Sequence, residues 1–259
     1  VDIQPRPEDR HDVAPEVVPG ADVDALPMEV SGEPLPAGAV MRLGASGLAH
    51  AQEIHHVALS RDGKTAWSSA IYESSPMAWD TATGRSLGRM PPVGEGSVGA
   101  LALSPDGETL AVAHDEAVAL VNPTTGVERA SVAGKDIVAV VWSPDGALIA
   151  VGQREGRIAL ADPATGKIKK ALRARDEMFD YLAFSPDGAR LATSGGDEGA
   201  VYVWDTKSGK KLFRWSVVGN GYGHGIAWLP DGTLVVATGA KEVVRFAPGA
   251  TQPSGTWPL

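Results

Sequence analysis

The sequence predicts an all-β fold, a β-propeller of four-stranded antiparallel blades, and two observations predict it. First, a tetrapeptide that ends in Asp-Gly recurs five times, with aspartates 44, 39, 42 and 44 residues apart, which is the period of one propeller blade. Second, short β-branched and aromatic runs flank each tetrapeptide, and no apolar 3.6-residue period that would indicate helix persists. The five aspartates are Asp62, Asp106, Asp145, Asp187 and Asp231.

The tetrapeptides have the chemistry of tight turns. In Ser-Pro-Asp-Gly, proline presets φ at the second position, aspartate suits the third, and glycine accepts a positive φ. Each turn joins a preceding strand, such as 182–184, to a following one, such as 190–193. A third strand, such as 200–204, follows about ten residues later, and a Thr-Gly or Ser-Gly turn comes after it. Four strands are therefore expected in each blade.

The predicted propeller covers residues 39–259. At about 43 residues a blade, this length holds five blades. Two interpretations stay open at this point: a closed ring of five blades, or part of a larger propeller. Residues 39–44 and residues 254–259 compete for the place of the outer strand that completes the last blade.

These motifs resemble the WD-repeat family. The pairs Trp79-Asp80 and Trp204-Asp205 stand where the signature dipeptide of that family ends the third strand, and His50 matches the histidine of its Gly-His pair. The other three blades depart from the dipeptide. The resemblance therefore implies a complete His-Ser-Asp-Trp hydrogen-bond network in at most one blade. The turn chemistry and the period look most like the bacterial branch of the family.

Charge separates an N-terminal segment from the rest. Residues 1–38 hold nine acids, two arginines and seven prolines, a net charge of −7 in a chain whose total is −9. We expect this segment to be an extended, disordered linker without a fold of its own. The remainder is nearly neutral, so we expect no nucleic-acid binding through a basic face.

Several other classes find no support in the sequence. No run approaches 18 apolar residues, so no membrane insertion is expected. The chain has no cysteine, which excludes disulfides and thiolate metal sites. The absence of cysteine leaves the compartment open between cytoplasm and export. Residues 94–99 match G-x-G-x-x-G but precede a strand, so they do not predict a dinucleotide site. Neither a cofactor nor a metal is predicted. Trp142 and Trp228, inside inner strands, are expected to pack between blades.

The sequence predicts a binding face rather than a catalytic centre. Propellers place the loops before the innermost strands and the loops between second and third strands at one channel mouth, and loops on a rigid scaffold carry function. The predicted partner-binding side chains at this mouth are Tyr72, His114, Arg154, Glu177, Tyr222 and His224. Aromatic and arginine residues of this kind anchor protein partners.

The leading hypothesis is therefore a non-catalytic scaffold that binds a protein or peptide, as part of a larger bacterial protein. The alternative is a ligand- or metal-binding propeller, a sensor or an enzyme, that uses the channel mouth. If five blades close the ring, His55 and His56 meet His224 across the seam, where imidazoles would suit a divalent metal or a pH-sensitive contact.

Overall fold

The computed structural model of the chain describes residues 53–70, 72–114, 116–174, 179–195, 200–216, 223–238 and 242–258, without the side chains of residues 223, 224 and 258. The predicted linker, residues 1–38, lies outside this part of the chain, and so does the predicted strand 39–44.

Twenty strands form five sheets of four. Blade 1 consists of β1 (Ile54–Leu59), β2 (Thr65–Ala70), β3 (Met77–Asp80) and β4 (Ser86–Arg89). Blade 2 consists of β5 (Ala100–Leu103), β6 (Leu110–Ala113), β7 (Ala117–Val121) and β8 (Glu128–Ala133). Blade 3 consists of β9 (Ile137–Trp142), β10 (Ile149–Gln153), β11 (Arg157–Ala161) and β12 (Ile168–Arg173). Blade 4 consists of β13 (Tyr181–Phe184), β14 (Arg190–Gly195), β15 (Ala200–Asp205) and β16 (Lys211–Ser216). Blade 5 consists of β17 (Gly223–Trp228), β18 (Leu234–Thr238), β19 (Glu242–Phe246) and β20 (Gly255–Pro258).

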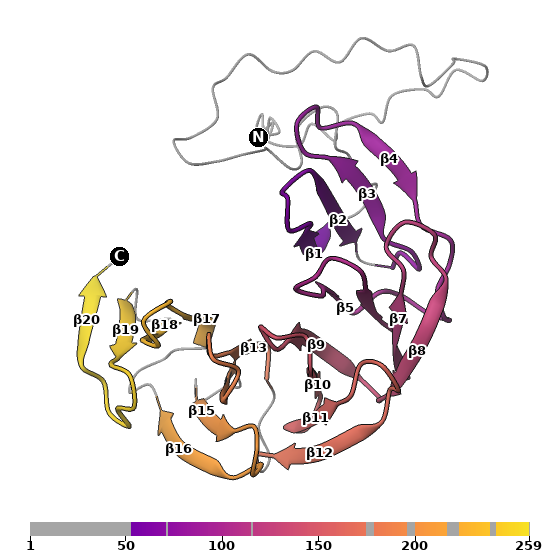
Figure 1. Cartoon of the computed structure of the whole chain (residues 1–259). Coiled ribbons are helices and arrows are strands. Elements are labelled where there is room, and N and C mark those ends of the chain that lie inside the picture. Colours follow the sequence, from indigo (N-terminus) through magenta and orange to yellow (C-terminus); the bar gives the residue numbers. More distant parts are fainter. Residues whose placement is uncertain are drawn as a thin grey trace, which may run out of the picture.

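The predicted fold class is confirmed. Within each blade the strands pair antiparallel in chain order, so each strand lies beside the next one. The first strand of every blade lies on the inside of the propeller and the fourth on its outer edge (Figure 1). The outer strand of blade 5 is β20, which settles the competition for that place in favour of the C-terminal residues.

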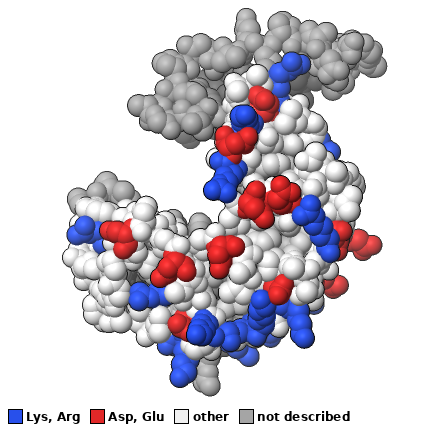
Figure 2. All heavy atoms as spheres, in the orientation of Figure 1, with Lys and Arg blue, Asp and Glu red and all other residues white. Residues whose placement is uncertain are grey.

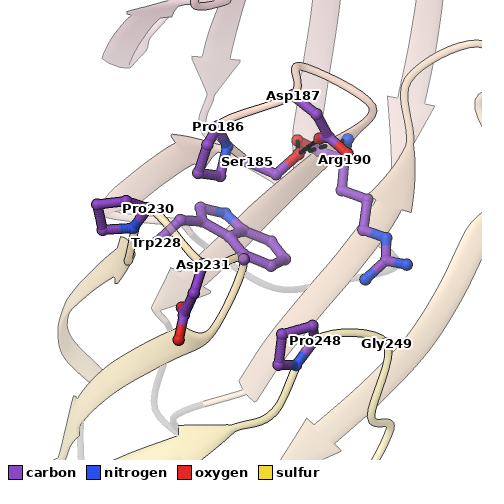
Figure 3. A pocket seen from close by; sticks show the side chains of 10 residues that line it. Ser185, Pro186, Asp187, Arg190, Trp228, Pro230, Asp231, Pro248 and Gly249 are labelled. Atoms are coloured by element: carbon purple, nitrogen blue, oxygen red, sulfur yellow. Dashed lines mark hydrogen bonds between the residues drawn. The ribbon is translucent and has the colours of Figure 1, made fainter.

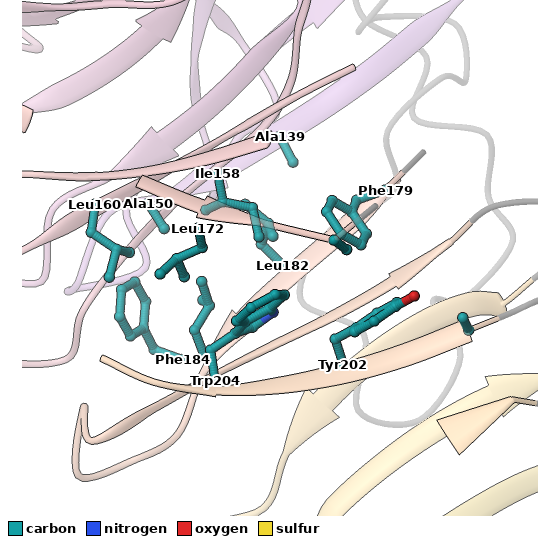
Figure 4. Packing of buried hydrophobic residues seen from close by; sticks show 13 residues of the cluster. Ala139, Ala150, Ile158, Leu160, Leu172, Phe179, Leu182, Phe184, Tyr202 and Trp204 are labelled. Atoms are coloured by element: carbon teal, nitrogen blue, oxygen red, sulfur yellow. The ribbon is translucent and has the colours of Figure 1, made fainter. Parts of the chain in front are cut away.

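The core lies between blades rather than inside them. A single sheet has two faces to bury, and blades 2, 3 and 4 each pack one face on the blade before and the other on the blade after. Between blades 3 and 4, for example, Ile158 and Leu160 of β11 meet Leu191 of β14 and Trp204 of β15, all at most 3% exposed (Figure 4). The rings of Tyr202 and Trp204 stack with centroids 5.9 Å apart. Equivalent apolar clusters join blades 1 and 2, 2 and 3, and 4 and 5.

The tetrapeptide turns have the predicted chemistry. In blade 3, Asp145 Oδ1 accepts hydrogen bonds from Ser143 Oγ at 2.6 Å and from the Ala147 amide at 3.0 Å. The amide of Gly146 donates to the Ser143 carbonyl at 2.9 Å, and its φ is +71°. Because Gly146 lies against the Pro105 ring and Gly188 against the Pro144 ring, turns of neighbouring blades lie side by side on one face of the propeller. In each blade the turn between the first and second strands and the turn between the third and fourth strands emerge on this face, which we call the turn face.

The described blades form an open arc. Blade 1 and blade 5 lie at its two ends with a gap between them (Figure 1). The extensive contacts between blades run only from each blade to the next in chain order, such as β1 with β5 and β13 with β17. The five described blades therefore do not close into the ring that was one of the two interpretations.

Candidate functional site

Tyr72 lies on the connection between β2 and β3, at the end of the strands opposite the turn face. Its side chain is 82% exposed, the highest value among the exposed large hydrophobic residues of the described chain. Its backbone has φ = 62°, a left-handed conformation that is strained for a residue with a bulky side chain. The next residue, Glu73, holds the connection in place through a two-pronged ion pair with Arg89, at 2.9 and 3.0 Å. The loop thus presents a large aromatic side chain to solvent on an anchored backbone.

Arg154 lies at the equivalent place in blade 3, on the hairpin between β10 and β11. Its side chain is exposed, and its amide donates to the Asp136 carbonyl at 3.0 Å. The following residue, Glu155, has φ = 62° and pairs with Arg157 at 3.0 Å. Arg154 therefore has the exposure that a partner-binding arginine requires.

His114 does not present its side chain as expected. It ends the β6 side of the β6–β7 hairpin and is 5% exposed, because its ring packs over Gly94, where a Cβ atom would lie 2.9 Å from His114 Cδ2. The absence of a side chain at Gly94 makes room for the imidazole. A hollow of about 610 Å³ opens beside this contact, with Glu95, Glu116 and Glu128 among its walls. The sequence does not predict the burial of His114, because it does not show that the segment around Gly94 packs against the β6–β7 hairpin.

The remaining predicted residues are not described in the same detail. Glu177, Tyr222 and the side chain of His224 lie outside the described residues, although the His224 backbone belongs to β17. The structure therefore describes the side chains of Tyr72 and Arg154 on exposed loops, and that of His114 beneath one. The partner-binding role of the six residues stays a prediction.

The histidine cluster that a closed ring would form is not assembled. Blade 1, which contains His55 and His56, lies across the gap from blade 5 (Figure 1). The rings of His55 and His56 have centroids 6.2 Å apart. Burial lowers the pKa of His56, and the neighbouring His55 lowers it further. Among the described residues, no group of three His, Cys, Asp or Glu side chains is placed to hold a metal ion.

The signature residues of blade 1 form a hydrogen-bonded unit. Trp79 Nε1 donates to Ser68 Oγ at 2.6 Å, and both side chains are buried. Asp80 Oδ1 accepts from the Thr83 amide at 2.7 Å and the Thr83 hydroxyl at 2.6 Å. These two bonds lower the pKa of the Asp80 carboxyl. His50, the expected member of this network, lies outside the described residues.

Blade 4 keeps the signature residues without the buried hydrogen bond. Thr193 occupies the position in blade 4 that Ser68 has in blade 1. Neither its hydroxyl nor Trp204 Nε1 has a hydrogen-bond partner among the described residues. Asp205 nevertheless caps its turn, accepting from the Ser208 amide at 2.6 Å and the Ser208 hydroxyl at 2.5 Å. The Trp-Asp pair in blade 4 is thus a packing and turn element.

The sequence reasoning missed one pocket. It lies between blades 4 and 5 on the turn face, and Arg190 and Trp228 line it (Figure 3). The sequence predicts only packing between blades for Trp228. It does pack there, but it also remains partly exposed toward the pocket. The alternation of residues along a strand is the same whether its tryptophan is half-exposed or fully buried, so the sequence does not predict the exposed part of Trp228.

Comparisons with known proteins point to one class. A family model described as the anaphase-promoting complex subunit 4 WD40 domain matches residues 126–179, and one described as WD domain, G-beta repeat, matches residues 180–205. WD repeat-containing protein SL1-17 of Schistosoma mansoni is 29% identical over 62% of this chain and 53% of its own length. WD repeat and SOCS box-containing protein 1 of Mus musculus is 31% identical over 40% of this chain and 24% of its own length. WD repeat-containing protein 1 of Gallus gallus is 30% identical over 42% of this chain and 18% of its own length.

The fold and these matches together support a WD-repeat family for the chain. The chain spans about half, or less, of the length of the relatives named above. All three are eukaryotic proteins, so the comparisons do not support the bacterial branch that the turn pattern favoured. Within the described ranges, no helix is long and apolar enough to cross a membrane.

Proposed function

We propose that the chain is a non-catalytic scaffold that binds a protein or peptide through the loops opposite the turn face, with Tyr72 and Arg154 as anchors. The exposure of Tyr72 is the observation that carries this proposal. A tyrosine that is 82% exposed on a strained backbone buries little of its ring against the described residues, whereas the same side chain buried by a partner contributes a large contact area at little entropic cost.

Arg154 complements this anchor. Tyrosine and arginine dominate the small number of residues that carry most of the binding energy in protein interfaces. Glu177, Tyr222 and His224 belong to the proposal on the grounds of their sequence positions alone. Relatives whose names identify them as WD-repeat proteins support a scaffold role. That the chain is part of a larger bacterial protein stays a prediction from the sequence, and the relatives named above do not support a bacterial origin.

Selection from a random peptide display library tests the proposal. Peptides selected on the full chain are titrated against Tyr72→Ala and Arg154→Ala. Each substitution is expected to weaken binding by about 1–3 kcal/mol, because each removes an anchor while the exposed position leaves folding intact. Val127→Ala is the matched control, since Val127 is 62% exposed on a turn of the opposite face. Peptides whose affinity is unchanged by both anchor substitutions would contradict the proposal.

A further inference from the structure

The pocket between blades 4 and 5 combines an aromatic floor with a cation. Its volume is about 390 Å³. Two of its walls are turns: the Ser185–Gly188 turn of blade 4 and the Leu229–Gly232 turn of blade 5. The third wall is the loop between β19 and β20, with Pro248 and Gly249. Figure 3 shows the indole of Trp228 between these walls, with the Arg190 side chain to one side of it.

Trp228 is held rigidly in this position. Its Nε1 donates to the carbonyl of Ala183 in blade 4 at 3.1 Å, which fixes the plane of the indole. The half-buried ring leaves part of its surface to the pocket. A fixed aromatic surface of this kind binds an apolar side chain without an entropic cost to the ring itself.

Arg190 is the cation of the pocket. Its side chain is half-buried, and its guanidinium makes no hydrogen bond or ion pair with any residue that the structure describes. The pocket also contains two carboxylates, each hydrogen-bonded within its own turn, and the nearby charge of Arg190 helps to lower the pKa of Asp187. Asp187 Oδ1 accepts from Ser185 Oγ at 2.6 Å and from the Ala189 amide at 3.0 Å, and Asp231 Oδ1 accepts from the Thr233 amide at 2.9 Å. Asp231 lies away from Arg190 (Figure 3). The Arg190 side therefore favours an anion.

A group of lysines extends the positive charge from this pocket along the turn face. Six of the nine lysines of the chain lie on the β11–β12 and β15–β16 turns or on the outer strands β12 and β16: Lys167, Lys169, Lys170, Lys207, Lys210 and Lys211. We call them the lysine group. The region of β12 and β16 is correspondingly rich in Lys and Arg along the outer edge of the arc (Figure 2). The nearby carboxylates are Asp162, paired with Lys169 at 2.9 Å, and Asp205.

The pocket and the lysine group belong to one continuous surface. The Thr206 hydroxyl donates to the Gly188 carbonyl at 2.9 Å, and the Thr206 amide donates to the Ala189 carbonyl at 3.0 Å. These bonds tie the turn that carries Lys207 to the turn that precedes Arg190. Gly209, in the same lysine-bearing turn, approaches the side chains of Leu172 and Lys170 of blade 3, so the two halves of the lysine group adjoin.

We propose that this surface is a second interaction site, which binds a short acidic segment of a partner protein. An apolar side chain of the segment lies on Trp228, a neighbouring carboxylate pairs with Arg190, and further carboxylates contact the lysine group. Ile168 and Leu212, 44% and 47% exposed among the lysines, suit a segment in which apolar residues alternate with acids. A short protein segment fits better than a nucleic acid or a membrane surface, because Trp228, Ile168 and Leu212 offer apolar contacts among the cations that a row of phosphates would not use.

The test is a fluorescence titration of the full chain with a short synthetic peptide in which Asp and Glu alternate with Leu around a central Trp. Two variants are each expected to weaken binding about tenfold or more. One is Arg190→Gln, and the other is the triple variant Lys207→Gln, Lys210→Gln and Lys211→Gln. Rising salt is expected to weaken binding further. The control triple variant, Arg61→Gln, Lys64→Gln and Lys135→Gln, removes the same charge from exposed positions elsewhere and is expected to bind as the unaltered chain does.

Circular dichroism and thermal melting show that each variant folds. Four results would overturn the proposal: no binding of the acidic peptide, equal binding of a peptide with Gln in place of its acids, an unchanged affinity of Arg190→Gln, or equal losses in the two triple variants. A short DNA duplex and phosphatidylserine vesicles are titrated in parallel. If the DNA or the vesicles bind more tightly than the peptide and lose that binding in the same variants, the ligand of this surface is a nucleic acid or a membrane and the proposal of a protein segment is wrong. The Tyr72 and Arg154 variants, on the opposite face, are expected to leave this binding unchanged.

Discussion

Trp142 Nε1 donates a hydrogen bond to the carbonyl of Ala102 at 3.1 Å, from the inner strand of blade 3 to the inner strand of blade 2. The same bond recurs two blades later, from Trp228 to Ala183 at 3.1 Å. Each indole thus bonds to the inner-strand backbone of the preceding blade and fixes the spacing of the two blades. Blade-to-blade geometry in this chain depends on single directional contacts as well as on apolar packing.

Trp142→Phe is therefore expected to lower the free energy of unfolding by about 0.5–1.5 kcal/mol, the net value of a neutral hydrogen bond. Phenylalanine keeps most of the packing and removes the donor. Urea denaturation followed by circular dichroism measures the difference. The control is Trp257→Phe, since Trp257 is 44% exposed on β20, and equal effects of the two substitutions would show that the hydrogen bond contributes nothing.

Gly166→Ala tests the contact between neighbouring blades at the outer edge. Gly166 has φ = +69°, and a Cβ atom there would lie 1.9 Å from the carbonyl oxygen of Ser131 in blade 2. At Gly107, with φ = +80°, a Cβ atom would meet nothing within 4 Å. Gly107→Ala is expected to cost about 1–2 kcal/mol of backbone strain, and Gly166→Ala at least about 1 kcal/mol more because a backbone must move. The same stability in both variants, measured by thermal melting, would contradict the clash.

Leu110→Ala tests the core between blades 1 and 2. Leu110 is fully buried in the apolar cluster that contains Trp67 and Val112. The substitution is expected to cost about 2–5 kcal/mol, because it removes buried methyl groups and leaves a cavity. Leu87→Ala, at a position 59% exposed on β4, is expected to change the stability by no more than about 0.5 kcal/mol. Urea denaturation compares the two, and a loss at Leu110 as small as at Leu87 would contradict packing between the blades as the source of stability.

Acid sensitivity is expected to arise in the tetrapeptide turns. Hydrogen bonds from Ser104 and Ser143 lower the pKa values of Asp106 and Asp145 from their ordinary value of 3.8. Folding therefore favours the ionised carboxyls. This contribution to stability is present above the unfolded pKa and is lost as the pH falls through the lower folded pKa.

The double variant Asp106→Asn, Asp145→Asn removes both titrating groups and keeps an acceptor oxygen at each position. Its melting temperature is expected to fall less than that of the unaltered chain between about pH 5 and about pH 2. Thermal melts across this range measure the difference, with the same buffers at constant ionic strength. Parallel curves for the two proteins would mean that other groups determine the acid response.

Much of the fold was predictable because its signals are local. The hydrogen bonds from Ser143 to Asp145 and from Thr83 to Asp80 join residues two and three positions apart. The positive φ of Gly146 belongs to the same short turn as Asp145. Such contacts depend on neighbouring side chains alone, so the turns, the four strands of each blade and the blade period follow from the sequence. Exposed loop positions such as Tyr72 and Arg154 were predictable for the same reason, since each lies on the short connection between second and third strands.

Contacts between distant residues were decided only by the tertiary structure. His114 is buried because the segment that contains Gly94 packs against it, and Arg190 lines a pocket two of whose walls come from blade 5. The open arc depends on the angle between each pair of blades, summed over four interfaces, and no single repeat contains that sum. The sequence by itself determined the blades and their turns. Only the packing of one blade on the next determined the arc, the buried imidazole, and the joining of the lysine group to the Arg190 pocket, because each of these depends on distances between residues from different repeats.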